Sequence, residues 1–244
     1  MRFSPQAFST YYNSPLGILS RRLIRNKIYQ LWPELRHYTL LGMGYPHPYL
    51  NRYTHQVERS VLTMPPVNEL TPWLHNEKNC LCVAEFDDQP FPDDFFDRIM
   101  IVHCLEFLSN VPEVLNECRR ILKPNGRILL VVPNRHSMWS RAEKTPFGYG
   151  SPFTPMQIKD YLTDARFYVE RMENALFAPP REHRLIRQIS PFIEKYGSYM
   201  FFRFGGVHVI EVSKQVYAPV KPDKGTWVDA RRPSILIPET SGVQ

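Results

Sequence analysis

The sequence predicts an α/β fold in which a mostly parallel sheet is covered by helices on both faces. Short, nearly continuous aliphatic runs of strand length alternate along the chain with segments of helical spacing. Such runs are typical of parallel strands whose two faces are both buried. In addition, Gly42 and Gly44 directly follow the first of these runs. Glycines at the end of a strand let a ligand approach the backbone closely, so this turn is a candidate binding site.

The individual elements are predicted from periodicity and from the residues that interrupt it. Residues 17–32 carry apolar residues at helical spacing, and Pro33 discourages continuation of that helix. Further helices are predicted over residues 111–122 and 154–162. Strands are predicted, in chain order, over residues 38–41, 60–64, 81–84, 98–102, 127–132, 167–172 and 207–213. Turn residues at 123–126 separate the second helix from the fifth strand.

Composition excludes several classes of protein. Of the 244 residues, 43% are hydrophobic and 22% are charged, which is ordinary globular usage and excludes wholesale disorder. A net charge of +6 is weaker than a dedicated nucleic-acid binder usually carries. Four cysteines cannot form a disulfide framework in a chain of this length. No uncharged apolar run approaches the roughly 20 residues that span a bilayer, so an integral membrane protein is not expected.

The amino-terminal segment is basic. No acidic residue precedes Glu34, whereas Arg21, Arg22, Arg25 and Lys27 lie in the first predicted helix. An arginine-rich, acid-poor amphipathic start is a feature of mitochondrial transit peptides. A leading helix with a solvated basic face accounts for the same pattern, and we favour this interpretation. The expected location is therefore cytoplasmic.

We expect three parts: a helical segment over residues 1–36, a domain over residues 37–218, and a flexible tail over residues 219–244. The domain carries an insertion near residues 177–205, with a predicted helical stretch at 184–189. The insertion interleaves basic residues with aromatic ones: Arg181, Arg184, Arg187, Lys195 and Arg203 with Phe192, Tyr196, Tyr199, Phe201 and Phe202. Such a segment can stack on bases or bind a membrane surface. Because the spacing does not produce one basic face, a substrate lid or a protein interface is favoured.

Two stretches carry a more specific pattern. Residues 85–97 read EFDDQPFPDDFFD, and residues 115–127 read LNECRRILKPNGR. Together they resemble the class I methyltransferase family, in particular its type 11 bacterial branch, which uses S-adenosylmethionine. The matching residues are Pro90, Phe91, Asp93, Phe96 and Asp97, then Leu115, Glu117, Arg120, Leu122, Lys123, Pro124 and Gly126. The resemblance covers residues 38–134 strongly and extends loosely to about 214.

The resemblance implies a Rossmann-like class I methyltransferase fold with a seven-stranded, mostly parallel sheet flanked by helices. It also implies S-adenosylmethionine as cofactor. On this basis Gly42, Met43 and Gly44 match the turn beneath the methionine part of the cofactor. Glu85 and Phe86 match the residues beside the adenine. Val102 and His103 match residues near the methyl group, and Met64 stands where the family has an acid that binds the ribose. We predict that Gly44→Val abolishes cofactor binding and leaves the fold intact.

The glycine-rich motif is degenerate. Leu40 replaces an acid that the family carries two residues before the first glycine, and Pro46 replaces the third glycine. With Met64 in place of the ribose-binding acid, cofactor binding is expected to be weaker by about tenfold or more. Two hypotheses follow: a methyltransferase of unknown substrate, or a catalytically inactive binding or regulatory protein with the same fold. A nucleotide-binding enzyme of another class is a third, less favoured, hypothesis, because no dehydrogenase or P-loop pattern is present.

The substrate cannot be read from any motif, although a small molecule is favoured. Asn134, Arg135 and Trp139 follow the fifth strand and are predicted to line the substrate pocket. His103 is a candidate proton acceptor or a pocket wall, and no other catalytic residue is assigned. No metal site is expected, because the cysteine spacing suits buried thiols better than a zinc site. The cysteines are Cys80, Cys82, Cys104 and Cys118.

Overall fold

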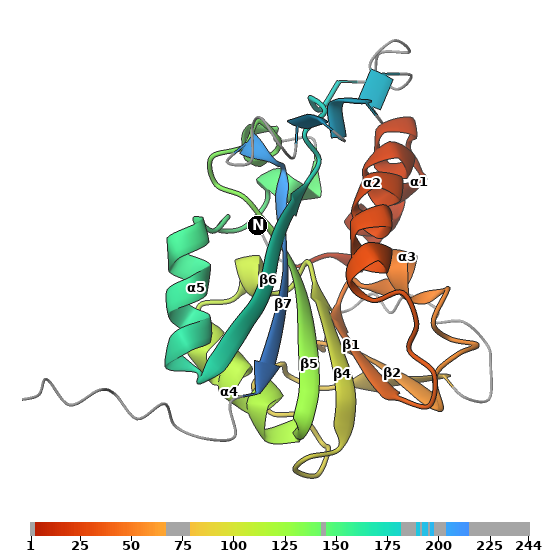
Figure 1. Ribbon diagram of the computed structural model, residues 1–244, viewed down its shortest axis with the longest axis vertical. Helices are drawn as coiled ribbons and strands as arrows, with labels where there is room; N and C mark the ends of the chain where they lie inside the picture. The colour runs from red at the N-terminus through yellow and green to blue at the C-terminus, as the bar shows by residue number, and fades with distance from the viewer. Residues whose placement is uncertain are drawn as a thin grey trace, which may run out of the picture.

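The computed structural model describes residues 3–66, 79–142, 145–181, 189–190, 192–194, 196–197 and 204–214. Its centre is a seven-stranded sheet with the order β3-β2-β1-β4-β5-β7-β6 (Figure 1). Strand β7 runs antiparallel to both of its neighbours, β5 and β6, and all other neighbouring strands are parallel. The strands are β1 (Thr39–Gly44), β2 (Arg59–Met64), β3 (Asn79–Val83), β4 (Phe96–Val102), β5 (Leu122–Pro133), β6 (Phe167–Ala175) and β7 (Val207–Lys214). This arrangement confirms the predicted fold class.

Strand β5 begins five residues earlier than the sequence predicts. Phe96 of β4 pairs with Leu122, and the next pair joins Arg98 to Arg127. The predicted turn at residues 123–126 is therefore a bulge inside the strand, because these four residues of β5 lie opposite the single residue Asp97 of β4. Gly126 lies in this bulge, where an added Cβ would lie 2.5 Å from the Leu122 side chain.

Two helices precede the sheet, where the sequence predicted one. Helix α1 (Pro5–Asn13) begins with Ser4, whose hydroxyl accepts a hydrogen bond from the Ala7 amide. Helix α2 (Pro15–Leu31) begins in the same way, because the hydroxyl of its N-cap residue Ser14 accepts a hydrogen bond from the Gly17 amide. The other helices are α3 (His47–Leu50), α4 (Val111–Ile121) and α5 (Pro155–Asp164), with short 3-10 segments at Leu105–Phe107, Trp139–Arg141 and Pro146–Gly148.

Helices cover both faces of the sheet, as predicted. Helices α1, α2 and α3 lie on one face, and α4 and α5 lie on the other (Figure 1). Successive residues of β1 enter the two cores in turn, because side chains alternate along a strand. Leu40 packs under the first set of helices, and Leu41 and Met43 pack under the second. The aliphatic strands are therefore buried on both sides, as in other parallel sheets.

One prediction about the cysteines is wrong. Cys104 and Cys118 are buried, but Cys80 is exposed and Cys82 is half-buried on β3. Strand β3 is the last strand on its side of the sheet, so its side chains are less covered than those of the central strands. In the described ranges, no three His, Cys, Asp or Glu residues are grouped as a metal site.

The tail over residues 219–244 and most of the predicted helical stretch at 184–189 lie outside the described residues. Within the insertion, Phe192 and Tyr196 are exposed. Across the parts of the chain that the structure describes, no helix has both the length and the apolar character needed to cross a bilayer.

Candidate functional site

The carboxyl ends of β1 and β4 lie side by side at the point where the strand order reverses. From β1 the chain continues to β2 on one side, whereas β4 lies on the other side. In open α/β sheets, ligands bind at such switch points, just beyond the carboxyl ends of the strands. Gly44 is paired with Val102 in the sheet, and the Tyr45 amide donates a hydrogen bond to the Val102 carbonyl at 2.6 Å. The structure therefore brings together Gly42, Gly44, Val102 and His103.

The two glycines are required by the packing of the chain itself. Gly44 has φ +81°, and a Cβ there would lie 2.3 Å from the Val102 carbonyl oxygen. A Cβ on Gly42 would lie 2.7 Å from Pro46 Cγ and 2.8 Å from Leu50 Cδ1. Both glycines are buried. Pro46, which stands in place of the family's third glycine, thus packs on the first glycine and shapes the turn.

A buried chain of hydrogen bonds lies beside this turn. Tyr49 donates to the Tyr12 hydroxyl at 3.0 Å, and Tyr12 lies 2.7 Å from His103 Nε2. His103 Nδ1 lies 3.0 Å from Glu106 Oε1. Because Tyr12 already accepts from Tyr49, its own proton points to Nε2, so the proton of a neutral His103 is on Nδ1 and is donated to Glu106. Tyr49, Tyr12, His103 and Glu106 therefore form one chain of hydrogen bonds in which each side chain donates to the next.

The network is enclosed in low-dielectric surroundings. The His103 and Glu106 side chains are at most 1% exposed. His103 has φ +48°, a conformation that is uncommon for a residue other than glycine. Burial raises the pKa of Tyr12 well above its ordinary value, and the neighbouring Tyr49 raises it further. Glu106 Oε2 is buried without a hydrogen-bond partner among the described residues, and such an acceptor is costly unless a ligand or water completes it.

Aromatic rings from the amino-terminal segment cover the switch point. Phe8 stacks on His103 with ring centroids 4.9 Å apart and an interplanar angle of 14°. Tyr12 lies parallel to Tyr45, with centroids 5.9 Å apart and an angle of 7°. Phe3 packs edge-on against Phe86 at 6.3 Å. Sequence reasoning missed this layer, because helical spacing was evident only from residue 17 onward.

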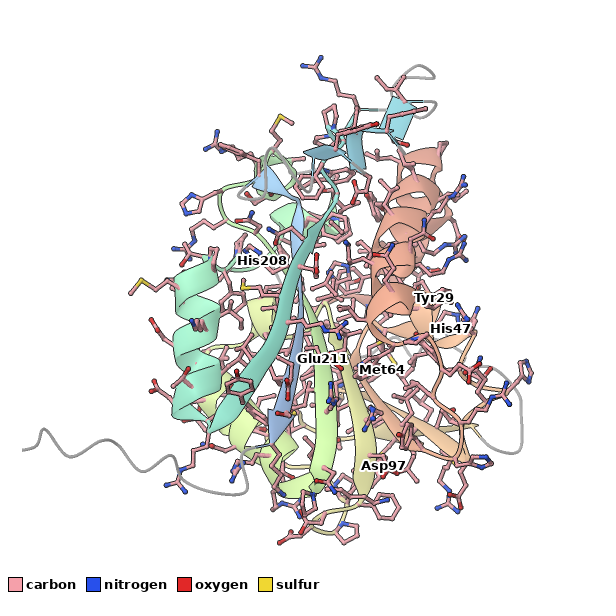
Figure 2. The ribbon with its side chains drawn as sticks, viewed as in Figure 1. Tyr29, His47, Met64, Asp97, His208 and Glu211 are labelled. Carbon is pink, nitrogen blue, oxygen red and sulfur yellow. The ribbon has the colours of Figure 1, made fainter. Side chains whose placement is uncertain are left out.

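The remaining residues predicted to bind the cofactor lie along the same edge of the sheet. Met64 ends β2 and is buried (Figure 2), and none of residues 59–66 is acidic. The described end of β2 therefore offers no carboxylate to a ribose. Glu85 follows β3 and is exposed, and Phe86 next to it is buried. Among the described residues, the loops after β3 and β4 supply carboxylates at this edge, including Glu85 and Glu106.

The residues predicted to line the substrate pocket make mainly backbone contacts. Asn134 is buried and donates to the Gly205 carbonyl at 2.8 Å. Trp139 is also buried, and its indole N–H donates to the Ala178 carbonyl at 2.8 Å. Arg135 is exposed and donates to the Pro152 carbonyl. These contacts hold the loop after β5 against β7 and the end of β6, and a contact with substrate stays a prediction for all three.

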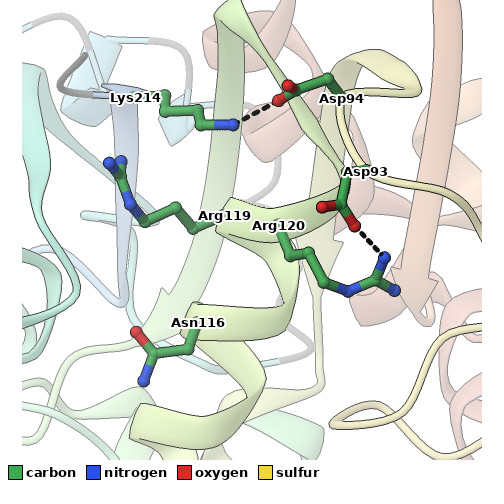
Figure 3. Close-up of a pocket in the computed structure, with 6 residues that line it drawn as sticks. All are labelled: Asp93, Asp94, Asn116, Arg119, Arg120 and Lys214. Atoms are coloured by element: carbon green, nitrogen blue, oxygen red, sulfur yellow. Dashed lines mark hydrogen bonds and ion pairs between the residues drawn. The ribbon is translucent and has the colours of Figure 1, made fainter.

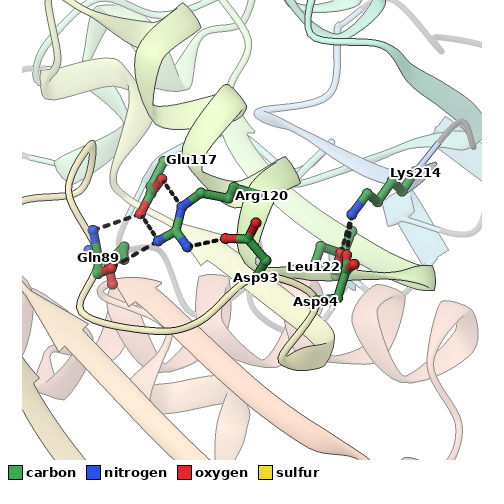
Figure 4. A network of polar contacts seen from close by, with 7 residues as sticks. All are labelled: Gln89, Asp93, Asp94, Glu117, Arg120, Leu122 and Lys214. Carbon is green, nitrogen blue, oxygen red and sulfur yellow. Dashed lines mark hydrogen bonds and ion pairs between the residues drawn. The ribbon is translucent and has the colours of Figure 1, made fainter.

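The motifs that resemble the methyltransferase family build a polar cluster at the opposite end of the sheet (Figure 4). Arg120 donates to both carboxylate oxygens of Glu117 and to Asp93, and it also contacts the Gln89 carbonyl. Lys214 pairs with Asp94 and donates to the Leu122 carbonyl. The conspicuous acids and bases of the two motifs therefore join α4 to the loop before β4.

A cavity of about 290 Å³ lies beside this cluster (Figure 3). Its lining consists of Asp93, Asp94, Asn116, Arg119, Arg120 and Lys214. Asp93 is paired with Arg120, and Asp94 is paired with Lys214. Because these charges already neutralise one another and the cavity is far from the switch point, we do not assign it a role in catalysis.

Comparisons with known proteins agree with this geometry. Residues 41–130 match the model of a family described as "Methyltransferase domain". The ubiquinone/menaquinone biosynthesis C-methyltransferase UbiE of Vibrio parahaemolyticus is 42% identical over 99 residues, which are 41% of this chain and 38% of that protein. The demethylmenaquinone methyltransferase of Tropheryma whipplei (strain Twist) is 46% identical over 43 residues, 18% of each chain. The chain thus spans about two fifths or less of the curated relatives that it matches.

Solved structures extend the likeness over most of the chain. A methyltransferase of Thermotoga maritima, described as a possible histamine N-methyltransferase, has a TM-score of 0.63 at 18% identity. The match covers 86% of this chain and 96% of that one. An S-adenosylmethionine-dependent methyltransferase of Archaeoglobus fulgidus has a TM-score of 0.57 at 21% identity, covering 80% and 95%. At these identities the structures show the shared fold.

Proposed function

We propose that this chain, which belongs to the class I S-adenosylmethionine-dependent methyltransferase family, binds that cofactor at the carboxyl ends of β1, β3 and β4 and methylates a small molecule. The observation that carries the proposal is the glycine turn of β1 at the switch point of a sheet with the family's strand order. Ligands of open α/β sheets bind at this position.

The residues at this edge fit a cationic ligand with a polar tail. The sulfonium and ammonium groups of S-adenosylmethionine are positive, and aromatic faces and carboxylates both attract cations. The edge offers the exposed carboxylate of Glu85 and the unpartnered buried oxygen of Glu106, and the rings of Phe8, Tyr12 and Tyr45 pack against one another above them. The missing acid at the end of β2 favours a weaker ribose contact than the family usually makes.

When bound, S-adenosylmethionine supplies an electrophilic methyl group, and its transfer requires in-line positioning more than protonation of the leaving group. The chain's own residues supply that positioning. Gly44 and the Tyr45 amide hold the end of β1 against β4. Helix α1 covers the site with aromatic rings, which exclude water and strengthen electrostatic contacts beneath them.

Isothermal titration calorimetry of the full chain with S-adenosylmethionine and S-adenosylhomocysteine tests the proposal. Binding at micromolar concentrations is expected for both ligands. Glu85→Ala should weaken binding by about 1–3 kcal/mol, because a charge-assisted hydrogen bond is lost. Asp88→Ala, which removes an exposed acid three residues away, is the matched control and should bind like the parent. Absence of heat with both ligands at a concentration on the order of 1 mM (a free energy of about −4 kcal/mol) would contradict the proposal.

A catalytically inactive binding protein is the second candidate. Two observations favour it: the absence of an acid in residues 59–66 and the packing of Phe8, Tyr12 and Tyr45 over the glycine turn. For this candidate we expect a folded protein, by circular dichroism, that gives no heat with either cofactor form. The exposed aromatic residues Phe192 and Phe204 of the insertion are then the surface that we propose for a protein partner.

A further inference from the structure

We infer that His103, supported by Glu106, accepts a proton from the hydroxyl of an aromatic substrate, and that Tyr12 occupies the place of that substrate in the closed molecule. The inference rests on the proposed methyltransferase function and names its substrate class, an aromatic ring that bears a hydroxyl group. Three features support it: the direction of the hydrogen bonds, the surroundings of the Tyr12 ring, and the way in which α1 is held.

The first feature is that the network presents an acceptor nitrogen of histidine to an aromatic hydroxyl group. His103 donates its Nδ1 proton to Glu106 Oε1, and Nε2 receives the proton of the Tyr12 hydroxyl at 2.7 Å. A carboxylate at Nδ1 orients the ring and stabilises the imidazolium that forms when Nε2 takes up a proton, which is the arrangement used for proton transfer from hydroxyl groups. A purely structural clasp would not require the buried carboxylate of Glu106, which costs free energy to desolvate.

The second feature is that the surroundings of Tyr12 suit any flat ring with one hydroxyl. Tyr45 lies parallel to one face of the Tyr12 ring, and Tyr49 meets it edge-on at 6.1 Å. His103 lies at the hydroxyl end, and the Tyr49 hydroxyl supplies a hydrogen-bond donor to the same oxygen. An aromatic hydroxyl compound would therefore find a stacking partner, a proton acceptor and a donor in one place.

The third feature is that Tyr12 belongs to a short helix, α1, which contacts α2 through Tyr11 and Ser20, whereas α2 reaches the sheet through contacts that do not involve α1. Helix α1 has nine residues, and extended backbone at Ser14 separates it from α2. Helix α2 has its own attachments to the sheet, through Trp32 to Glu211 and Lys27 to Glu173. Displacement of α1 would therefore uncover His103 without detaching α2.

The chemistry balances with S-adenosylmethionine as the co-reactant. The O–H bond of the aromatic hydroxyl breaks and its proton moves to His103 Nε2. The oxygen forms a bond to the methyl carbon, and the methyl–sulfur bond breaks with its electron pair left on sulfur. The products are the aryl methyl ether, S-adenosylhomocysteine and an imidazolium, which then releases the proton to water.

The test uses 4-nitrophenol as probe, because its phenolate absorbs visible light and its phenol form does not. Added to the full chain below neutral pH, with S-adenosylhomocysteine present, the probe should show the phenolate band on binding. His103→Asn and Glu106→Gln should each reduce that band at saturating probe by tenfold or more (about 1.4 kcal/mol). His55→Asn, which changes an exposed histidine, should leave it unchanged. Tyr12→Phe should tighten probe binding several-fold, because the internal competitor loses its hydrogen bond.

Calorimetry with S-adenosylhomocysteine, run on every variant, separates this inference from the proposed function. If the ligand binds the parent and the probe does not, the substrate class is wrong while the proposed function stands. If the probe binds as phenolate equally well to folded His103→Asn, histidine is not the proton acceptor. If Tyr12→Phe only lowers the melting temperature and leaves probe affinity unchanged, the network is a clasp for α1 and the inference is overturned.

Discussion

Gly44 lies where two strands approach more closely than a side chain allows. Its φ is +81°, and a Cβ at this residue would lie only 2.3 Å from the Val102 oxygen, which excludes any branched residue. The prediction that Gly44→Val leaves the fold intact is therefore wrong. We predict that even Gly44→Ala lowers the free energy of unfolding by about 3 kcal/mol or more, because strain and a backbone contact add. Urea denaturation measures this loss, and Met43→Leu, a volume-conserving change one residue away, should cost less than about 1.5 kcal/mol.

His208 makes stability depend on pH. Burial, with a smaller contribution from His136, lowers the pKa of His208 to about 4 from the ordinary 6.5. Above pH 6.5 the residue is neutral in both states. As the pH falls from about 6.5 to about 4, the unfolded chain binds a proton that the folded chain does not. Up to about 3 kcal/mol of stability is then lost, and below about pH 4 the loss levels off.

The measurement is the free energy of unfolding at several pH values for the parent and for His208→Asn, which keeps a donor for the Asn174 oxygen. The difference between the two proteins should shrink between pH 6.5 and 4. Other groups titrate in this range, so the difference, rather than either curve alone, isolates His208. A constant difference would contradict the prediction.

At the scale of elements, Asp97 joins β1, β4 and β5 at the end of the sheet opposite to His208 (Figure 2). Asp97 Oδ2 accepts from the Thr39 amide at 2.9 Å and from its hydroxyl at 2.8 Å, and Lys123 lies 2.9 Å away. Burial alone would raise the pKa of Asp97, but the hydrogen bonds from Thr39 and Lys123 outweigh it and lower the pKa.

We predict that Asp97→Asn costs about 1–3 kcal/mol at neutral pH, because the amide keeps the shape and loses the charge-assisted bonds. Because the folded-state pKa is lowered, the cost should fall as the pH falls through that value. A double-mutant cycle with Lys123→Met, measured by chemical denaturation, gives the part of this cost that comes from the interaction between Asp97 and Lys123. Asp160→Asn, on the exposed face of α5, should cost less than about 0.5 kcal/mol.

At the scale of the whole molecule, the amino-terminal segment is fastened to the carboxyl-terminal strand. The Trp32 indole donates to Glu211 Oε1 at 2.9 Å, and Arg127 donates to the same oxygen at 3.0 Å. Glu211 is buried on β7, so these donors supply hydrogen bonds that solvent cannot provide there. The contact joins residues far apart in the sequence and makes one cooperative unit of the helices and the sheet.

Trp32→Phe should therefore lower the free energy of unfolding by about 2–4 kcal/mol, because it removes a donor from a buried carboxylate and a large ring from the core. Differential scanning calorimetry should still show a single transition at a lower temperature. The matched control is Lys27→Met, which breaks the more exposed pair with Glu173 at 3.4 Å and should cost less than about 1 kcal/mol. An equal loss in the free energy of unfolding for the two variants would show that the contact with Glu211 stabilises the protein no more than the exposed pair does.

The sequence by itself determined the strands, the later helices and the family. Those features depend on apolar residues that repeat every two or 3.6 positions and on turn residues. Both are local signals that can be read directly from the sequence. The motifs at residues 85–97 and 115–127 predicted the fold by their resemblance to the family, and in the structure they form a polar cluster between neighbouring elements. Helix α1 escaped prediction because its apolar spacing is weak, although the Ser-Pro pairs at residues 4–5 and 14–15 are start signals for both amino-terminal helices.

Only the tertiary structure decided what the binding edge contains. Hydrogen bonds join Tyr12 to Tyr49, 37 positions along the chain, and to His103, 91 positions along it. No periodic signal connects such positions, since their approach depends on how α1 crosses the ends of β1 and β4. The close approach of β1 to the end of β4 explains why Gly44 is a glycine, and the segment after β4 places Glu106 as a buried carboxylate beside His103. Contacts between residues so far apart in the sequence form when whole helix and sheet surfaces pack together. The local pattern of the sequence therefore does not predict them.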